Sequence, residues 1–261
     1  MIDHLSYSAI DTFLTCPLKF KFRYVDKKPE ITSPAAALGK AFHKAMESNF
    51  RFRLVQHVDQ PLPQVIAAFE TEFKDAVDHP MYKKDEAPNE VTIDWRGESK
   101  ARVRDSGIAL VKRYYRDQVP FMEPAEVEAK YELPLQGKHI KYLVGYIDLI
   151  LKSGIVIDYK TVMQPWKEDR VHVHMQPTFY SLLLGRPTSF DFHFIVKNST
   201  REAGISVRRT ERSQKDIDWL SSQLQNYVNI IENCLETGSF PASPGVHCSY
   251  CDYRRPCGYR T

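Results

Sequence analysis

Hydrophobic and polar positions divide the chain into a mainly helical first part and a mixed second part. Apolar residues recur at helical spacing in 5–25, 35–52, 61–78 and 97–118, which predicts four helical segments that each bury one face. Pro17 interrupts the first segment, and Ser8 with Asp11 three positions later predicts a capping box near its start. The proline- and charge-rich stretch 80–89 predicts a loop.

Strand patterns follow Pro124. Apolar and polar positions alternate from Val127 to Leu135, which is the period of a half-buried strand. Gly137 and Gly154 separate this run from 138–152 and 155–160, and the three runs predict a meander. We also expect a helix over 166–184, strands over 190–196 and 205–209, a long amphipathic helix over 213–237 and a loop-like tail.

This order of elements predicts an α/β (α+β) fold with a central mixed β-sheet flanked by helices. No obvious linker interrupts the chain, so we expect a single domain over 1–261. Its parts would be a mainly helical N-terminal part (1–120), a sheet core (121–212), and a C-terminal helix with a cysteine-rich tail (213–261).

Composition narrows the class of protein. The chain has 36 Lys+Arg and 33 Asp+Glu, a net charge of +3, and 43% hydrophobic residues, so intrinsic disorder is not expected. No apolar run approaches the roughly 18 residues of a membrane span, and the N-terminus lacks the apolar region of a secretory signal. We therefore expect a cytoplasmic protein. The weak positive balance permits a nucleic-acid partner without requiring one.

The clearest candidate chemistry lies in 145–161. Asp148 interrupts an apolar strand, and Asp158 and Lys160 follow the next one. Residues two apart on a strand share a face, so two carboxylates and an ammonium are expected to converge. Such a group suits Mg²⁺ or Mn²⁺ and hydrolysis by a metal-activated water. The alternative is a structural ion pair between Asp158 and Lys160.

The five cysteines are an odd number in a chain expected to be intracellular, so a disulfide framework explains them poorly. Cys248, Cys251 and Cys257 follow a C-x₂-C-x₅-C spacing, and Cys16 lies near the other terminus. Four thiolates satisfy either zinc or an iron–sulfur cluster, and the spacing alone leaves both open, as well as unliganded thiols. Cys234 falls inside the long helix and is predicted to be a buried small hydrophobe.

These motifs resemble the PD-(D/E)xK nuclease superfamily, in the branch of the RecB and AddB nuclease domains and the CRISPR-adaptation exonucleases. The match lies in Gly145-Tyr-Ile-Asp148 and Asp158-Tyr159-Lys160-Thr161. The resemblance implies that Asp148, Asp158 and the Tyr159 carbonyl oxygen ligate the metal, while Lys160 serves the attacking water.

Two further signatures of the same branch flank this core. Gly39 and His43 form G-x-x-x-H, and Gln176 and Tyr180 form Q-x-x-x-Y, each sharing one face of a helix. The resemblance implies that His43 is another metal ligand and that Gln176 and Tyr180 contact DNA or support the lysine. Without that context each would be an ordinary helix residue. Glu47, one turn after His43, could orient it or be a plain exposed acid.

The resemblance also implies a 4Fe–4S cluster on the four spaced cysteines, which are Cys16, Cys248, Cys251 and Cys257, with zinc as the alternative. The expected activity is a metal-dependent DNA exonuclease on single-stranded DNA or DNA ends, in DNA repair or recombination. The competing interpretation is a non-catalytic DNA-binding or accessory subunit of a helicase–nuclease or CRISPR-adaptation complex.

Basic and aromatic residues alternate beside Cys16, and further arginines lie among the other cysteines. They predict contacts to the phosphates and bases of single-stranded DNA. The alternative is that the rings, such as Phe20, belong to the core while the charges are solvated. The candidate DNA-binding residues are Lys19, Lys21, Arg23, Arg254 and Arg255.

Overall fold

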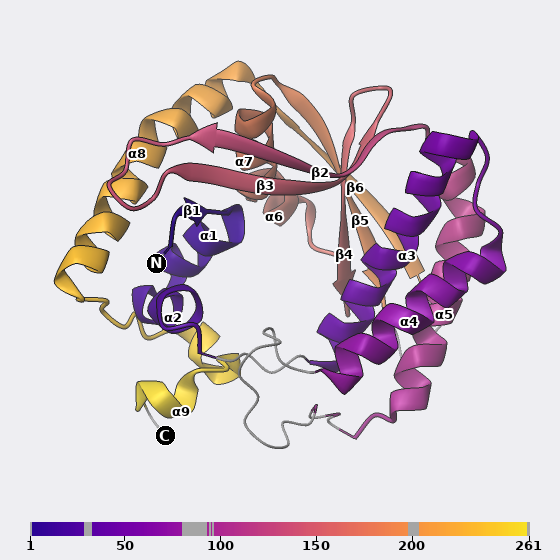
Figure 1. The fold of residues 1–261 in the computed structure, drawn as a ribbon, viewed down its shortest axis with the longest axis horizontal. Helices are drawn as coiled ribbons and strands as arrows, with labels where there is room; N and C mark the ends of the chain where they lie inside the picture. Colours follow the sequence, from indigo (N-terminus) through magenta and orange to yellow (C-terminus); the bar gives the residue numbers. More distant parts are fainter. Residues whose placement is uncertain are drawn as a thin grey trace.

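The computed structural model describes residues 2–28, 33–79, 93, 95, 97–197 and 204–259. The loop expected over 80–89 lies outside these residues. Figure 1 shows a bent sheet with one group of helices at each end of it, and the two ends of the chain lie on the same side of the molecule. None of the described helices has the length and apolar character needed to cross a membrane.

Six strands of the described residues form one mixed sheet, which confirms the expected fold class. The path runs β1-β3-β4-β5-β6, and β2 pairs with β3 from the other side. The β1–β3 and β4–β5 pairs are parallel, and the remaining pairs are antiparallel. The strands are β1 (His4–Leu5), β2 (Pro124–Pro134), β3 (Tyr142–Leu151), β4 (Val156–Val162), β5 (Thr188–Val196) and β6 (Gly204–Arg212).

One edge of β3 is shared by two short ladders. β1 pairs with it at Tyr142 and Leu143, whereas β4 pairs with it at Leu149 and Ile150. The middle of this edge pairs with no other described strand. The next pair in the β3–β4 register would be Asp148 and Asp158, but the strands separate there, so the two carboxylates come from diverging strands.

Three helices cover one face of the sheet, α3 (Pro34–Gln56), α4 (Leu62–Asp78) and α5 (Lys100–Asp117). Serine side chains cap two of these helices, because Ser33 accepts from the Ala36 N–H and Ser99 from the Arg102 N–H. Their apolar faces and the inward residues of β2 to β5 form one core. Its members include the helix residues Phe42, Phe69, Leu110 and Tyr114 and the strand residues Val127, Leu149, Ile157, Tyr159 and Ile195.

The opposite face packs against α6 (Glu168–Val173) and α7 (Gln176–Leu184) through Phe190, Phe192 and Phe194 of β5. A third core joins α1 (Tyr7–Thr15), α2 (Pro17–Phe20), α7 and α8 (Gln214–Thr237). The remaining helical segments are a short π-helix (Lys21–Val25), two 3₁₀ helices (Val119–Phe121 and Val246–Tyr250) and α9 (Arg254–Cys257).

Three elements differ from the sequence-based expectation. The helix expected over 166–184 is two helices, because Pro177 has no N–H to donate and its ring would crowd the carbonyl of Val173, so α6 ends there. The cap of α1 is Ser6, which accepts from the Ala9 N–H, and not Ser8, which lies inside the helix. The tail expected to be loop contains the 3₁₀ turn at 246–250 and α9.

Candidate active site

The separation of β3 from β4 creates the candidate site. Past Leu149 and Ile157 the main-chain ladder stops, and the Tyr159 N–H donates instead to Oδ2 of Asp148 at 2.9 Å. Asp148 therefore satisfies the β4 backbone while its carboxylate stays in the opening between the strands.

Asp158 lies beside it with 3% of its surface exposed. Gln176 Nε2 donates to Asp158 Oδ1 at 2.6 Å, and the Lys160 ammonium lies 2.6 Å from Oδ2. Burial raises the pKa of Asp158, and Asp148 adds to this rise while Lys160 opposes it. The expected convergence of Asp148, Asp158 and Lys160 is thus present in the geometry.

His43 reaches this opening from α3. Its Nδ1 lies 3.4 Å from Asp148 Oδ1, and its Nε2 is 3.0 Å from the carbonyl oxygen of Tyr159. Burial alone would lower the pKa of His43, but Asp148 outweighs burial, and the pKa is raised to about 9. Because both ring nitrogens face acceptor oxygens, the charged imidazolium suits the site in the absence of metal. Gly39, one turn earlier, faces Thr161 of β4, where a Cβ would lie 3.3 Å from Oγ1.

Gln176 and Tyr180 share one face of α7, as their spacing predicts. Gln176 Nε2 donates to the Tyr180 hydroxyl at 3.1 Å, and that hydroxyl donates to the Tyr146 carbonyl at 2.8 Å. The chain of hydrogen bonds links the open edge of β3 to Asp158. Gly145 allows this approach, since a Cβ there would lie 2.5 Å from Leu183 Cδ1 of α7.

Glu128 of β2 completes the group, and sequence reasoning missed it. One ligating atom from each of His43, Glu128 and Asp148 lies within 4.8 Å of the others. Burial, with a further contribution from Asp148, raises the pKa of Glu128 to about 7. The sequence does carry a signal for this position. Lys138 lies midway between Glu128 and Asp148, so a hairpin turning there places the two opposite one another.

An open groove of about 620 Å³ runs along α3, and His43, Glu128 and Lys160 are among the residues that line it. Glu47 also lines the groove, and its carboxylate binds Lys44 and Arg51. Of the two alternatives for Glu47, orientation of His43 is therefore not seen.

The donor set of this site fits a hard divalent cation. Carboxylate oxygens, one imidazole and the Tyr159 carbonyl are the ligands that Mg²⁺ and Mn²⁺ accept. The buried Oδ2 of Asp158 also receives no hydrogen bond of good geometry, although the Lys160 ammonium is close to it.

The four spaced cysteines line a second, small cavity of about 30 Å³ between the N-terminal helices and the tail, as Cys16, Cys248, Cys251 and Cys257. The N–H of Ser243 points at Cys16 Sγ at 3.5 Å, and the N–H of Gly245 points at Cys248 Sγ at 3.4 Å. Such N–H groups suit sulfurs that carry negative charge. Cys234 is buried within α8, as expected.

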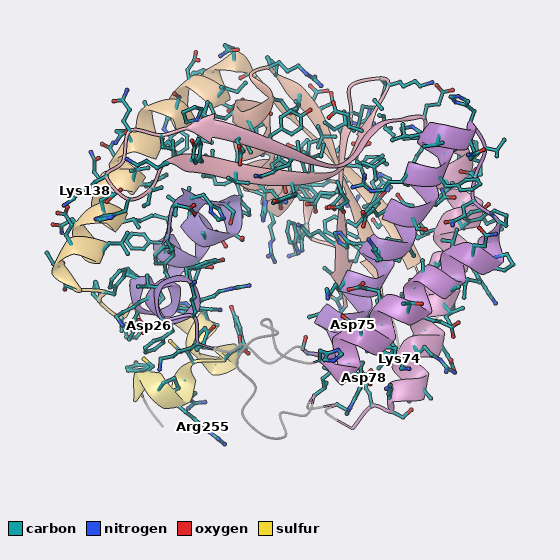
Figure 2. All side chains as sticks on the ribbon, in the orientation of Figure 1. Asp26, Lys74, Asp75, Asp78, Lys138 and Arg255 are labelled. Carbon is teal, nitrogen blue, oxygen red and sulfur yellow. The ribbon has the colours of Figure 1, made fainter. Side chains whose placement is uncertain are left out.

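The basic–aromatic segment after Cys16 is only partly available to a ligand. Phe20 and Phe22 are buried, against Phe240 and Tyr253 respectively, so these rings belong to the core. Lys21 forms an ion pair with Asp26, while Lys19 and Arg23 are half-buried. Arg254 and Arg255 of α9 are exposed, and Figure 2 shows Arg255 pointing outward from the tail.

The model of the PD-(D/E)XK nuclease superfamily matches residues 4–258. No curated protein matches the sequence. The crystal structure of a "Putative exonuclease" from Eubacterium rectale is similar with a TM-score of 0.62 and 13% identity, over 97% of this chain and 88% of that one. At this identity the likeness shows the fold alone. The crystal structure of SSO0001 is 15% identical over 83% of this chain and 96% of that one, and its TM-score of 0.40 is too low to define the fold.

Proposed function

Since the chain belongs to the PD-(D/E)XK nuclease superfamily, we propose that it is a metal-dependent DNA exonuclease that hydrolyses phosphodiester bonds. The observation that carries this proposal is the convergence of Asp148, Asp158, Lys160 and His43 at the point where β3 and β4 separate. The name given to the structurally similar protein from Eubacterium rectale supports an exonuclease over an endonuclease.

In this proposal His43, Asp148, Asp158 and the Tyr159 carbonyl would hold the cation. A bound divalent metal would supply Lewis acidity and lower the pKa of a water molecule. Lys160 orients the attacking water and offsets negative charge as the phosphodiester reacts, because its ammonium is held by Asp158 at the edge of the groove.

Gln176 and Tyr180 act as positioning residues. The Gln176 amide fixes one oxygen of Asp158, and the Tyr180 hydroxyl holds that amide while it is itself anchored on the β3 backbone. The second oxygen of Asp158 is thereby turned toward Lys160. Rigid support of this kind keeps reacting groups within the narrow geometric range that catalysis needs.

The nuclease assay compares wild type with Asp158→Asn and Asp191→Asn on end-labelled single-stranded DNA with Mn²⁺ or Mg²⁺. Asp191 is the matched control, because it is also a buried strand aspartate paired with a cation, Arg209, yet lies outside the candidate site. Asp158→Asn should lose at least ~10²-fold activity, and Asp191→Asn should retain most of it. Equal activity in the two variants, or none in wild type, would reject the catalytic proposal and favour a non-catalytic DNA-binding subunit.

We further propose that Cys16, Cys248, Cys251 and Cys257 hold a 4Fe–4S cluster. The four thiols line one small cavity between the N-terminal helices and the tail. Main-chain N–H groups point at the sulfurs of Cys16 and Cys248, which supports charged thiolates at this place, and zinc stays the alternative. The cluster would join Cys16 to the tail and so stabilise the contact between segments far apart in sequence.

The proposed substrate is single-stranded DNA or a DNA end. Support comes from Lys19 and Arg254, which line the cysteine cavity, and from Arg255, the exposed neighbour of Arg254. These cations would contact phosphates. Degradation of single strands in preference to blunt duplexes is the expected result, and charge reversal at Arg255 should weaken binding at low salt.

A further inference from the structure

Glu128 occupies an irregular position in β2, whose ladder with β3 also has a register shift between Pro124 and Glu126. Its neighbours pair across the ladder, Val127 with Leu149 and Ala129 with Ile147, but Glu128 has a φ of 48°. Val127 belongs to the core beneath α3, whereas Tyr131, four residues later, packs on the opposite face of the sheet. The side chains of β2 therefore change face at Glu128, and the Glu128 carboxylate lies on the same side of the sheet as His43.

The carboxylate of Glu128 has no cation of its own. No described residue forms a hydrogen bond or an ion pair with it, although it is half-buried and close to the carboxylate of Asp148. Glu47 in the same groove is different, because Lys44 and Arg51 neutralise it. Two carboxylates this close repel each other unless positive charge lies near both. Without metal the His43 imidazolium supplies part of that charge, and a bound divalent cation would supply more.

We propose that Glu128 is a further ligand of the divalent cation, and that with His43 and Asp148 it forms a three-donor group on the β2 side of the site. The proposal rests on the proposed function for the identity of the cation. Its geometric basis is independent, since the three donors come from β2, β3 and α3 and lie within 4.8 Å of one another.

This arrangement gives β2 a role beyond support of the sheet. Asp158 is engaged by Gln176 and Lys160 on the other side of Asp148, so the cation would contact two groups of donors, with Asp148 common to both. An imidazole and carboxylates in this combination suit Mn²⁺ and Mg²⁺.

The test measures Mn²⁺ binding without DNA, by electron paramagnetic resonance titration of the whole protein and of Glu128→Gln and Glu47→Gln. Glu128→Gln keeps the size of the side chain and removes its charge. We expect its Mn²⁺ dissociation constant to rise at least ~10-fold, by analogy with the 10–100-fold effects of residues that support metal ligands. Glu47→Gln should change it by less than about threefold. With chelator present, Glu128→Gln should unfold at the same or a higher temperature than wild type, since repulsion with Asp148 is relieved.

Unchanged Mn²⁺ affinity in Glu128→Gln would overturn the inference. Equal weakening by Glu47→Gln would also overturn it, because the effect would then come from the total negative charge of the groove. Neither result affects the proposed function, which is decided by the DNA assay of Asp158→Asn and Asp191→Asn.

Discussion

Gly145 offers a direct test of how the fold positions the candidate site. A Cβ at this residue would lie 2.5 Å from Leu183 Cδ1 and 3.3 Å from Tyr180 Cε1. In Gly145→Ala either Leu183 changes rotamer or α7 moves away from β3. Movement of α7 would carry Gln176 away from Asp158 and break the bond of 2.6 Å between them.

Two opposing effects determine how much Gly145→Ala changes the free energy of unfolding. Insertion of a methyl group into a packed contact costs about 1–3 kcal/mol. The lower backbone entropy of alanine in the unfolded chain returns about 0.4–1 kcal/mol. The expected net loss of stability is therefore about 1–2 kcal/mol. The expected loss of activity is larger, since a displacement of about 1 Å can reduce the rate ~10²-fold.

The assay is urea unfolding together with single-turnover cleavage of labelled DNA. Leu183→Ala removes the clashing atom, so the double variant should recover activity and show favourable coupling of about 1 kcal/mol. Gly204→Ala is the control, because a Cβ there would lie an ordinary 3.6 Å from the Cβ of Val196. Wild-type stability and activity in Gly145→Ala, or no recovery with Leu183→Ala, would refute this account of the α7–β3 contact.

The remaining predictions concern acid stability and iron. Burial lowers the pKa of His193 to about 4, and its Nδ1 lies 2.7 Å from the hydroxyl of buried Tyr114. As the pH falls, the unfolded chain therefore binds a proton at His193 before the folded chain does. His193 contributes about 3 kcal/mol to the free energy of unfolding above pH ~6.5, and this contribution decreases as the pH falls toward 4. Urea unfolding of His193→Gln should show a weaker dependence on pH across this window; a slope equal to that of wild type would contradict the prediction. Freshly purified protein should be brown and contain iron, which Cys16→Ser should reduce and Cys234→Ser should not. Stoichiometric zinc in colourless protein would favour the alternative metal.

Local signals in the sequence were enough for most of the elements. The apolar runs of β4 and β5, the alternation in β2 and the serine caps of α3 and α5 depend on residues close to one another in the chain. The D-x-K spacing predicted that Asp158 and Lys160 share a face, and they do. Gly39 with His43, and Gln176 with Tyr180, lie within the helices α3 and α7, where a spacing of four places two residues on one face.

The features that were missed depend on tertiary structure. The left-handed backbone of Glu128 has no local cause in Val127 or Ala129, and it follows from the change of face that β2 makes between two cores. A strict alternation would have left Glu128 as an ordinary solvent-facing acid. The sequence left open whether rings such as Phe20 belong to the core. The burial of Phe20 and Phe22 depends on Phe240 and Tyr253, which are more than 200 positions away.

That contact between the two ends of the chain has a consequence for protein synthesis. The main chain of Leu18 bonds to Pro241, and Phe20 stacks on Phe240, so α2 cannot acquire its native neighbours until those late residues leave the ribosome. At about 5–20 residues per second, the delay is roughly 10–40 s. During this interval the apolar side of the first helices has no native cover. Residues 17–20 are thus translated well before they can reach their final packing, and nascent chains that stall before Phe240 would expose a surface that chaperones recognise.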